Sequence, residues 1–154
     1  MAQQGERLRR WRAMVLIAVF IVGLGLLLTR CPSNRDGMPG QLAQSMEETV
    51  AAARSGTLAL ELWIQRRSTD QLTSVQLSDA RDEVVKAYKG IADLRAEDRV
   101  DIERQRTLTE SMTTIIAQLN AAAATIRHVT SEPAPHKARD ELWASADALE
   151  SGYR

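Results

Sequence analysis

The sequence predicts an all-α protein in which a single N-terminal transmembrane helix precedes an antiparallel bundle of three to four helices. Three observations lead to this fold class. An uninterrupted apolar run lies near the N-terminus, apolar residues recur at steps of three and four through most of the chain, and only 4% of the residues are aromatic. The chain is also rich in Ala, Leu, Gln, Glu and Arg, which favour helix over sheet. Its 154 residues leave room for one modest domain besides the membrane segment.

The apolar run covers residues 13–28, AMVLIAVFIVGLGLLL, and carries no charged side chain. Counted from Trp11 to Thr29, it spans about 28 Å as a helix, close to the hydrocarbon thickness of about 30 Å. A buried core helix would normally have a polar face, and this run has none. We therefore expect a transmembrane signal anchor over residues 13–29.

The charges around this run predict its orientation. Residues 1–12 include the basic cluster RLRRWR, which outweighs the positive charge beyond the run. Basic residues stay on the cytoplasmic side, so residues 1–12 should be cytoplasmic and the rest of the chain extracytoplasmic. We expect Trp11, Arg12 and Arg30 to lie at the membrane interfaces. Arginine outnumbers lysine 17 to 3, which favours a bacterial cell envelope as the location.

Cys31, the only cysteine, follows Thr29-Arg30 directly and has three interpretations. In outline the segment resembles a bacterial lipoprotein signal, but the bulky Arg30 stands where such signals have a small residue. Ordinary signal cleavage needs an A-x-A-like site and an apolar region of about 7–15 residues, and neither fits well here. We favour an uncleaved anchor; lipidation of Cys31 and signal cleavage are the alternatives.

Beyond the anchor, the sequence predicts a flexible linker at residues 30–40 and a helical domain at 41–154. Pro and Gly residues in CPSNRDGMPG break any helix there. Helices are expected at about 39–67, 70–96, 98–130 and 135–151. Ser68-Thr69-Asp70 offers a break and an N-cap for the second helix. The small residues around Gly56 would let a neighbouring helix approach closely.

Heptad-type stripes define the expected core of each helix. In the first helix they are Ala43, Met46, Val50, Ala53, Thr57, Leu60 and Ile64. In the second they are Leu77, Ala80, Val84, Ala87, Ile91 and Leu94. In the third they are Leu108, Met112, Ile115, Leu119, Ala122, Ile126 and Val129, and in the fourth Leu142, Ala146 and Leu149. The stripes are narrow and rich in alanine, so a homo-oligomer formed through one of them is also possible.

The residue pattern offers no chemistry that would make the chain an enzyme. From Cys31 onward the formal net charge is −4, with no cluster of basic residues, so nucleic acid is not an expected partner. His128 and His136 are separated by two prolines and lack the spacing of a helical metal pair. Adjacent acidic residues point about 100° apart on a helix and do not converge on a substrate. We expect no catalytic residue, no metal and no cofactor.

A partner surface is the remaining expectation. Trp63 and Trp143 lie at the edges of the stripes, and tryptophan is enriched at interface hot spots. Arg66 and Arg67 add a basic patch beside Trp63. The chain is therefore expected to be a membrane-anchored interaction or scaffold protein, an accessory subunit of an envelope complex that contacts the membrane and other envelope proteins. A ligand-sensing bundle and a divisome-type single-pass coiled-coil protein are the alternatives.

Overall fold

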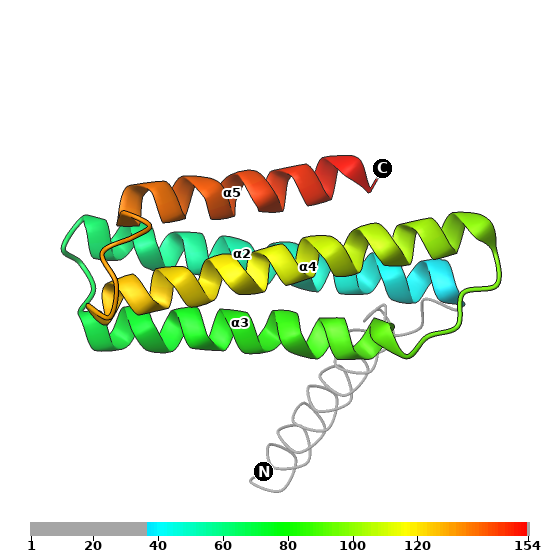
Figure 1. Ribbon diagram of the computed structural model, residues 1–154, viewed down its shortest axis with the longest axis horizontal. Helices are drawn as coiled ribbons and strands as arrows, with labels where there is room; N and C mark the ends of the chain where they lie inside the picture. Colours follow the sequence, from blue (N-terminus) through cyan, green and yellow to red (C-terminus); the bar gives the residue numbers. More distant parts are fainter. Residues whose placement is uncertain (1–36, 154) are drawn as a thin grey trace, which may run out of the picture. The chain divides into compact units, whose positions relative to one another are not determined.

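Residues 37–153 are described by a computed structural model, and within this range the chain forms four α-helices and no β-strand (Figure 1). The expected all-helical class is confirmed for these residues. None of the four helices is long and apolar enough to cross a membrane. The expectations that lie outside the described residues concern the span 13–29, Trp11, Arg12, Arg30 and Cys31.

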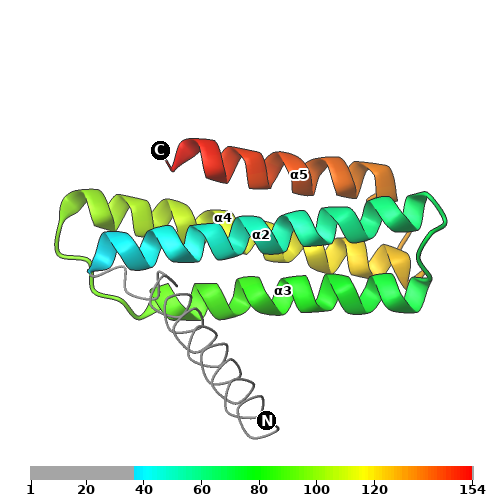
Figure 2. The same cartoon turned by 180° about the vertical axis from the view of Figure 1, so that it is seen from behind.

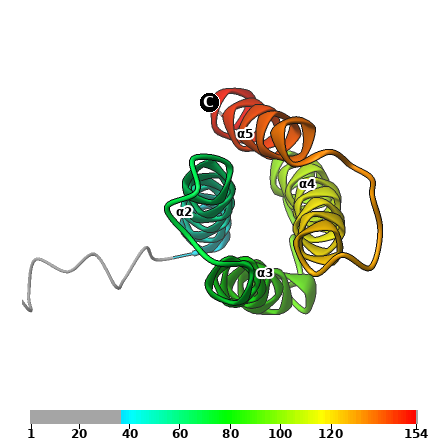
Figure 3. The same cartoon turned by 90° about the vertical axis from the view of Figure 1, so that its left-hand side faces the viewer.

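The helices are α2 (Met38–Ile64), α3 (Asp70–Ala92), α4 (Arg99–Ile126) and α5 (Pro135–Gly152). They run alternately up and down, and Figure 2 shows the same antiparallel arrangement from behind. Viewed along the helices, each packs beside the next, and α5 returns to pack on α2 (Figure 3). α2 also contacts α4 across the bundle, whereas α3 and α5 lie on opposite sides. The α2–α3 turn and the α4–α5 connection share one end of the bundle.

Polar side chains cap the beginnings of α3 and α4. The hydroxyl of Thr69 accepts a hydrogen bond from the amide of Leu72 at 3.2 Å, and Asp98 accepts one from the amide of Val100 at 2.7 Å. Each bond satisfies one of the amides that a helix start leaves unpaired. The N-cap predicted within Ser68-Thr69-Asp70 is therefore confirmed, and Thr69 provides it.

Prolines open the other two helices, since the fixed φ of proline suits the first helical turn. In α2, Pro39 is the second residue of the helix. Gly37 precedes the helix with a φ of 88°, which glycine adopts readily. In α5, Pro135 is the first residue. α2 begins at Met38, so the helix already includes the last residues of the segment expected to be a linker.

Two helices end in the same backbone motif at the same end of the bundle. Arg66 follows α2 and His128 follows α4, and both have a φ of 57°, in the left-handed region. The residue after each donates its amide hydrogen to a carbonyl five residues back, at 2.8 Å in α2 and 2.9 Å in α4. This is the Schellman motif, whose left-handed position is usually glycine. These turns end α2 and α4 three and four residues earlier than expected.

The core contains nearly all of the predicted positions of α3, α4 and α5. The buried residues confirmed there are Leu77, Ala80, Val84, Ala87, Ile91, Leu108, Met112, Ile115, Leu119, Ala122, Ile126, Leu142, Ala146 and Leu149. Two predictions differ: Val129 has 72% of its surface exposed, and Leu94, two residues after the end of α3, is only partly buried. The α4 helix ends at Ile126, so its stripe does not extend that far.

The buried face of α2 is rotated from the predicted stripe. Val50, Ala53, Thr57 and Leu60 are buried as predicted, but Ala43, Met46 and Ile64 are only partly buried. In addition, α2 buries Leu42, Ser45, Thr49, Ala52, Gly56 and Ala59. The cause is that α2 contacts all three other helices, so it buries a wide face that includes small and polar residues.

Gly56 marks the closest approach of α2 to its neighbours. A Cβ atom at this position would lie 2.6 Å from Leu119 Cδ2 of α4 and 3.1 Å from Leu142 Cδ2 of α5. Both leucines are fully or almost fully buried. The expectation that small residues here permit close packing is confirmed.

Candidate functional site

A shallow groove follows the outer surface between α2 and α5, and we call it the α2–α5 groove. It consists of two hollows on either side of Arg54, which lines both. One hollow, of about 280 Å³, is lined by Met46, Val50 and Ala51 of α2 and by Glu150 and Tyr153 of α5. The other, of about 330 Å³, is lined by Thr57, Leu58 and Glu61 of α2 and by Arg139, Asp140 and Trp143 of α5.

The second hollow carries two large apolar side chains that the bundle does not bury. Leu58 is 58% exposed and Trp143 is 53% exposed. Their neighbours in sequence, Ala59 and Leu142, are buried in the core. Leu58 and Trp143 therefore belong to the outer surface, where they line the same hollow.

Charged side chains fix the position of the tryptophan. The guanidinium of Arg54 lies 5.8 Å from the centre of the Trp143 ring, a cation–π distance. The same guanidinium forms an ion pair with Glu150 of α5. Arg54 thus connects the two helices and orients the indole, although the indole is half exposed to solvent.

A second ion pair crosses the groove one step further along. Arg139 Nη1 donates a hydrogen bond to Glu61 Oε2 at 2.7 Å, and Arg139 also binds Asp140 at 2.7 Å. The hydrogen bond from Arg139, followed by one from Gln65, lowers the pKa of Glu61. The same hydrogen bond, which the Glu61 carboxylate accepts, raises the pKa of Arg139. Both groups are charged at neutral pH, so the groove has charged walls around an apolar centre.

Trp63 lies elsewhere, at the end of the bundle where α2 turns into α3. Its indole Nε1 donates a hydrogen bond to Asp70 Oδ1 at 2.7 Å, and His128 Nε2 lies 3.2 Å from Asp70 Oδ2. Asp70 therefore links the end of α2, the start of α3 and the residue after α4. The hydrogen bond from Trp63, followed by that from His128, lowers the pKa of Asp70.

The four predicted partner residues do not form one surface. Trp63 and the exposed Arg66 line a cavity of about 620 Å³ at the end of the bundle, together with Pro135 and His136. Arg67 is also exposed at this end. Trp143 lies eight residues after Pro135, about 12 Å further along α5 by the helical rise. Trp143 belongs to the α2–α5 groove instead.

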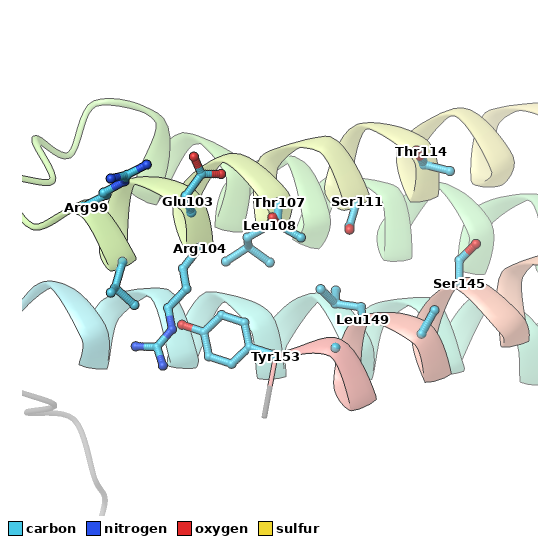
Figure 4. A pocket seen from close by; sticks show the side chains of 13 residues that line it. Arg99, Glu103, Arg104, Thr107, Leu108, Ser111, Thr114, Ser145, Leu149 and Tyr153 are labelled. Carbon is cyan, nitrogen blue, oxygen red and sulfur yellow. The ribbon is translucent and has the colours of Figure 1, made fainter.

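A larger groove of about 700 Å³ lies between the first half of α4 and the end of α5, and we call it the α4–α5 groove (Figure 4). Its α4 wall is polar and includes Arg104, Thr107 and Ser111, whereas its α5 wall includes Ala148 and Leu149. At 18 residues, α5 is shorter than the 28-residue α4. The first turns of α4 therefore extend beyond the α5 helix.

Within residues 37–153, no group of three or more His, Cys, Asp or Glu residues is placed to hold a metal ion. His128 and His136 both lie near the α2–α3 turn; His128 contacts the carboxylate of Asp70, and His136 interacts electrostatically with Glu61. The carboxylates of Asp70 and Glu61 are bound by hydrogen-bond donors that hold them in their charged form. These contacts describe structural links rather than an acid–base pair.

Sequence reasoning missed Leu58 and Arg54, the partners of Trp143. Leu58 has a weak signal, because it falls between the stripe residues Thr57 and Leu60 and is apolar at an outward position. Arg54 has none, since its role depends on α5 packing beside α2.

No protein-family model matches the chain, and the comparisons with curated proteins and with solved structures give no significant match.

Proposed function

We propose that this chain is a membrane-anchored, extracytoplasmic interaction protein whose α2–α5 groove binds an amphipathic helix of another envelope protein. The observation that carries the proposal is the pair of exposed apolar side chains, Leu58 and Trp143, beside a guanidinium that orients the indole. The anchor over residues 13–29 and the orientation follow from the sequence alone.

The groove has the dimensions of a site for a helix. The residues that line it on α2 extend from Met46 to Glu61, about 22 Å by the helical rise. Val50 and Thr57, one in each hollow, are seven residues apart, which corresponds to about 10.5 Å. A helix laid along the groove would place apolar residues at positions i and i+7 in the two hollows, in the helix-in-groove mode of recognition.

Preorganisation of the groove supports the same proposal. Side chains that are already ordered lose less conformational entropy when a partner binds. Trp143 is held by Arg54, and Arg139 is held by Glu61 and Asp140. A tryptophan with an ordered rim of ion pairs is the type of residue that supplies most of the binding energy at an interface.

A displayed library of helical peptides, about 14 to 18 residues long, tests the proposal with the full chain as bait. We expect enriched peptides to carry two large apolar residues seven positions apart. Their binding should weaken at least about tenfold in the Leu58→Asp and Trp143→Ala variants, because hot-spot residues contribute about 2 kcal/mol or more. Leu72→Asp is the matched control, since Leu72 is similarly exposed but lies on α3.

Three results would argue against the groove as a helix site. The library could yield no common spacing, the groove variants could bind the enriched peptides as well as the wild type, or Leu72→Asp could have the same effect. A cysteine introduced at Leu58 that crosslinks two copies of the chain would point to self-association instead.

The anchor is tested separately, by topology and by mass. Alkaline phosphatase fused after Arg154 should be active outside the cytoplasm, whereas a fluorescent protein that folds only in the cytoplasm should stay dark when it is fused there. Mass spectrometry of the intact protein should show an uncleaved N-terminus and an unmodified Cys31. An acylated Cys31 would show that the protein is lipidated, and a shortened chain would show that the signal is cleaved. Either result would contradict the uncleaved signal anchor.

A further inference from the structure

The hydroxyl groups of α4 fall into two classes. Those of Thr109, Thr113, Thr114 and Thr125 donate hydrogen bonds to carbonyl groups one turn earlier in the helix. Thr107 and Ser111, four residues apart on one side of α4, form no hydrogen bond with any described residue, and both line the α4–α5 groove. Their hydroxyl groups are therefore available to a ligand in this groove.

Two arginines line the same groove. Arg104 lies over the Tyr153 ring at 5.9 Å and forms an ion pair with Asp101 at 3.8 Å, a separation longer than a hydrogen bond. Arg99 also lines the groove and forms no ion pair within residues 37–153. Figure 4 shows Arg104 directed toward Tyr153, and Glu103 directed away from it.

Apolar side chains from both helices form another part of the lining. Ala148 and Leu149 of α5 face the groove, and the buried Leu108 of α4 forms part of its lining. Further along, a hydrogen bond links α4 to α5: Gln118 Nε2 donates to Ser145 Oγ at 2.9 Å. The volume of about 700 Å³ lies within the range of about 300–1,000 Å³ that is typical of small-molecule sites.

We infer that the α4–α5 groove binds a small amphiphilic carboxylate, with the carboxylate held by Arg104, Thr107 and Ser111 and the aliphatic part against Leu108, Ala148 and Leu149. The three polar groups recur at i, i+3 and i+7 and so share one side of α4. This site goes beyond the proposed function, because α4 and α5 form it rather than α2 and α5, although Tyr153 lines both grooves.

The donor set explains why the ligand should be an anion. A guanidinium has only donors, and a hydroxyl group can donate as well as accept, whereas an ionised carboxylate has only acceptors. Hydrogen bonds from arginine to a carboxylate are among the strongest in proteins. An alcohol of the same chain length would keep the apolar contacts and could accept a hydrogen bond from Arg104, but it would lose the charge–charge attraction to the guanidinium.

Photocrosslinking with a diazirine analogue of dodecanoate tests the site in the full chain, held in amphipol. We expect the adducts to map by mass spectrometry to peptides around Thr107–Ser111 and Ala148–Gly152. Unlabelled dodecanoate should compete with the analogue at least about tenfold better than dodecan-1-ol, because a hydrogen bond to a charged group contributes about that ratio or more.

Matched variants distinguish binding in this groove from nonspecific binding to the protein surface. Arg104→Gln with Thr107→Val removes two of the donors, and we expect it to weaken competition by dodecanoate about tenfold. Arg106→Gln with Thr113→Val makes the same changes on exposed parts of α4 outside the groove and should bind as the wild type does. Ala148→Phe should block the groove, whereas Ala144→Phe, outside the groove on the same helix, should not.

The inference is overturned if the adducts are confined to residues 13–29 or are spread over the surface. It is also overturned if dodecan-1-ol competes as well as dodecanoate, or if Ala148→Phe and Ala144→Phe behave alike. Thermal unfolding of each variant identifies any that fails to fold. In that case the two Arg/Thr double variants carry the comparison, since all four of their positions are at the surface.

Discussion

Arg54 of α2 places its guanidinium 5.8 Å from the centre of the Trp143 ring of α5, and it also forms an ion pair with Glu150. The contact orients the indole without burying it, since 53% of Trp143 remains exposed. A side chain of this size contributes more to stability when it is buried, so the exposed part of Trp143 is free to take the binding role proposed above.

Neighbouring substitutions in α5 should separate these two roles. Leu142→Ala should lower the free energy of unfolding by about 2–5 kcal/mol, because it leaves a cavity in the core. Trp143→Ala should lower it by about 1 kcal/mol, the size of a cation–π contact at an exposed site. Urea unfolding of the full chain followed by circular dichroism measures both. Equal losses for the two variants would make Trp143 a structural residue.

Two glycines in helices should respond in opposite ways to alanine. No neighbouring atom lies within 4 Å of the point that a Cβ atom would occupy at Gly90, so Gly90→Ala should stabilise α3 by up to about 1 kcal/mol through helix propensity. Gly56→Ala would gain the same propensity but would bring a methyl group to 2.6 Å from Leu119 Cδ2. Overpacking of this kind costs about 1–3 kcal/mol, which exceeds the gain.

The measurement is the thermal unfolding midpoint of Gly90→Ala and of Gly56→Ala, each compared with the wild type. Each variant serves as the control of the other. An increase for Gly90→Ala and a decrease for Gly56→Ala is expected. An increase for both would mean that Leu119 and Leu142 have room to move, and that the close approach of α2 is not required.

The core of α3 could be predicted from the sequence because that helix has one apolar face. Its positions from Leu77 to Ile91 recur at steps of three and four, and all are buried. The prediction for α2 was less accurate, because that helix contacts all three other helices and buries a wider face with more small and polar residues. Thr49 is fully buried with its hydroxyl bound to the Ser45 carbonyl, whereas Leu58 is exposed. Judged by hydrophobicity alone, Thr49 would be placed at the surface and Leu58 in the core, and both assignments are wrong.

The candidate sites depend on contacts between helices, which a stripe does not encode. Trp143 was recognised as an edge residue, but its neighbours Arg54 and Leu58 come from α2, more than eighty residues earlier in the chain. The α4–α5 groove depends on the position and shorter length of α5 beside α4. Helix ends were also misplaced, since Arg66 and His128 end their helices in a conformation that usually signals glycine.

Glycine at the left-handed position after α2 should stabilise the protein. Arg66 has a φ of 57°, which costs an L-residue about 1–2 kcal/mol relative to the right-handed region. Glycine removes this cost but loses about 0.5–1 kcal/mol through its greater freedom in the unfolded chain. We therefore expect Arg66→Gly to raise the free energy of unfolding by up to about 1 kcal/mol, measured by urea unfolding.

His128 provides the matched case, with the same φ of 57° and an additional contact to Asp70. His128→Gly removes the same cost of the left-handed conformation, but it also removes this link between α3 and the end of α4. Its stabilisation should therefore be smaller than that of Arg66→Gly. If His128→Gly proves the more stable of the two, the contact with Asp70 does not contribute to folding.

Acid should weaken the end of the bundle through Asp70. The hydrogen bond from Trp63, followed by that from His128, holds the pKa of Asp70 below its ordinary value. A carboxyl group whose pKa is lowered in the folded state stabilises the fold above its unfolded pKa, which is about 3.9 for aspartate. That contribution is lost as the pH falls from this value through the lower pKa of the folded state.

The Asp70→Asn variant should isolate this contribution, since asparagine can still accept a hydrogen bond from the Trp63 indole but does not titrate. At pH 7 it should be less stable than the wild type, and the difference should shrink as the pH falls below about 4. Asp79→Asn is the control, because it removes a carboxylate from the same helix without touching Trp63 or His128. The measurement is the thermal unfolding midpoint of the full chain between pH 7 and pH 2. A constant difference between Asp70→Asn and the wild type over this range would show that the charge of Asp70 does not stabilise the junction of α2, α3 and α4.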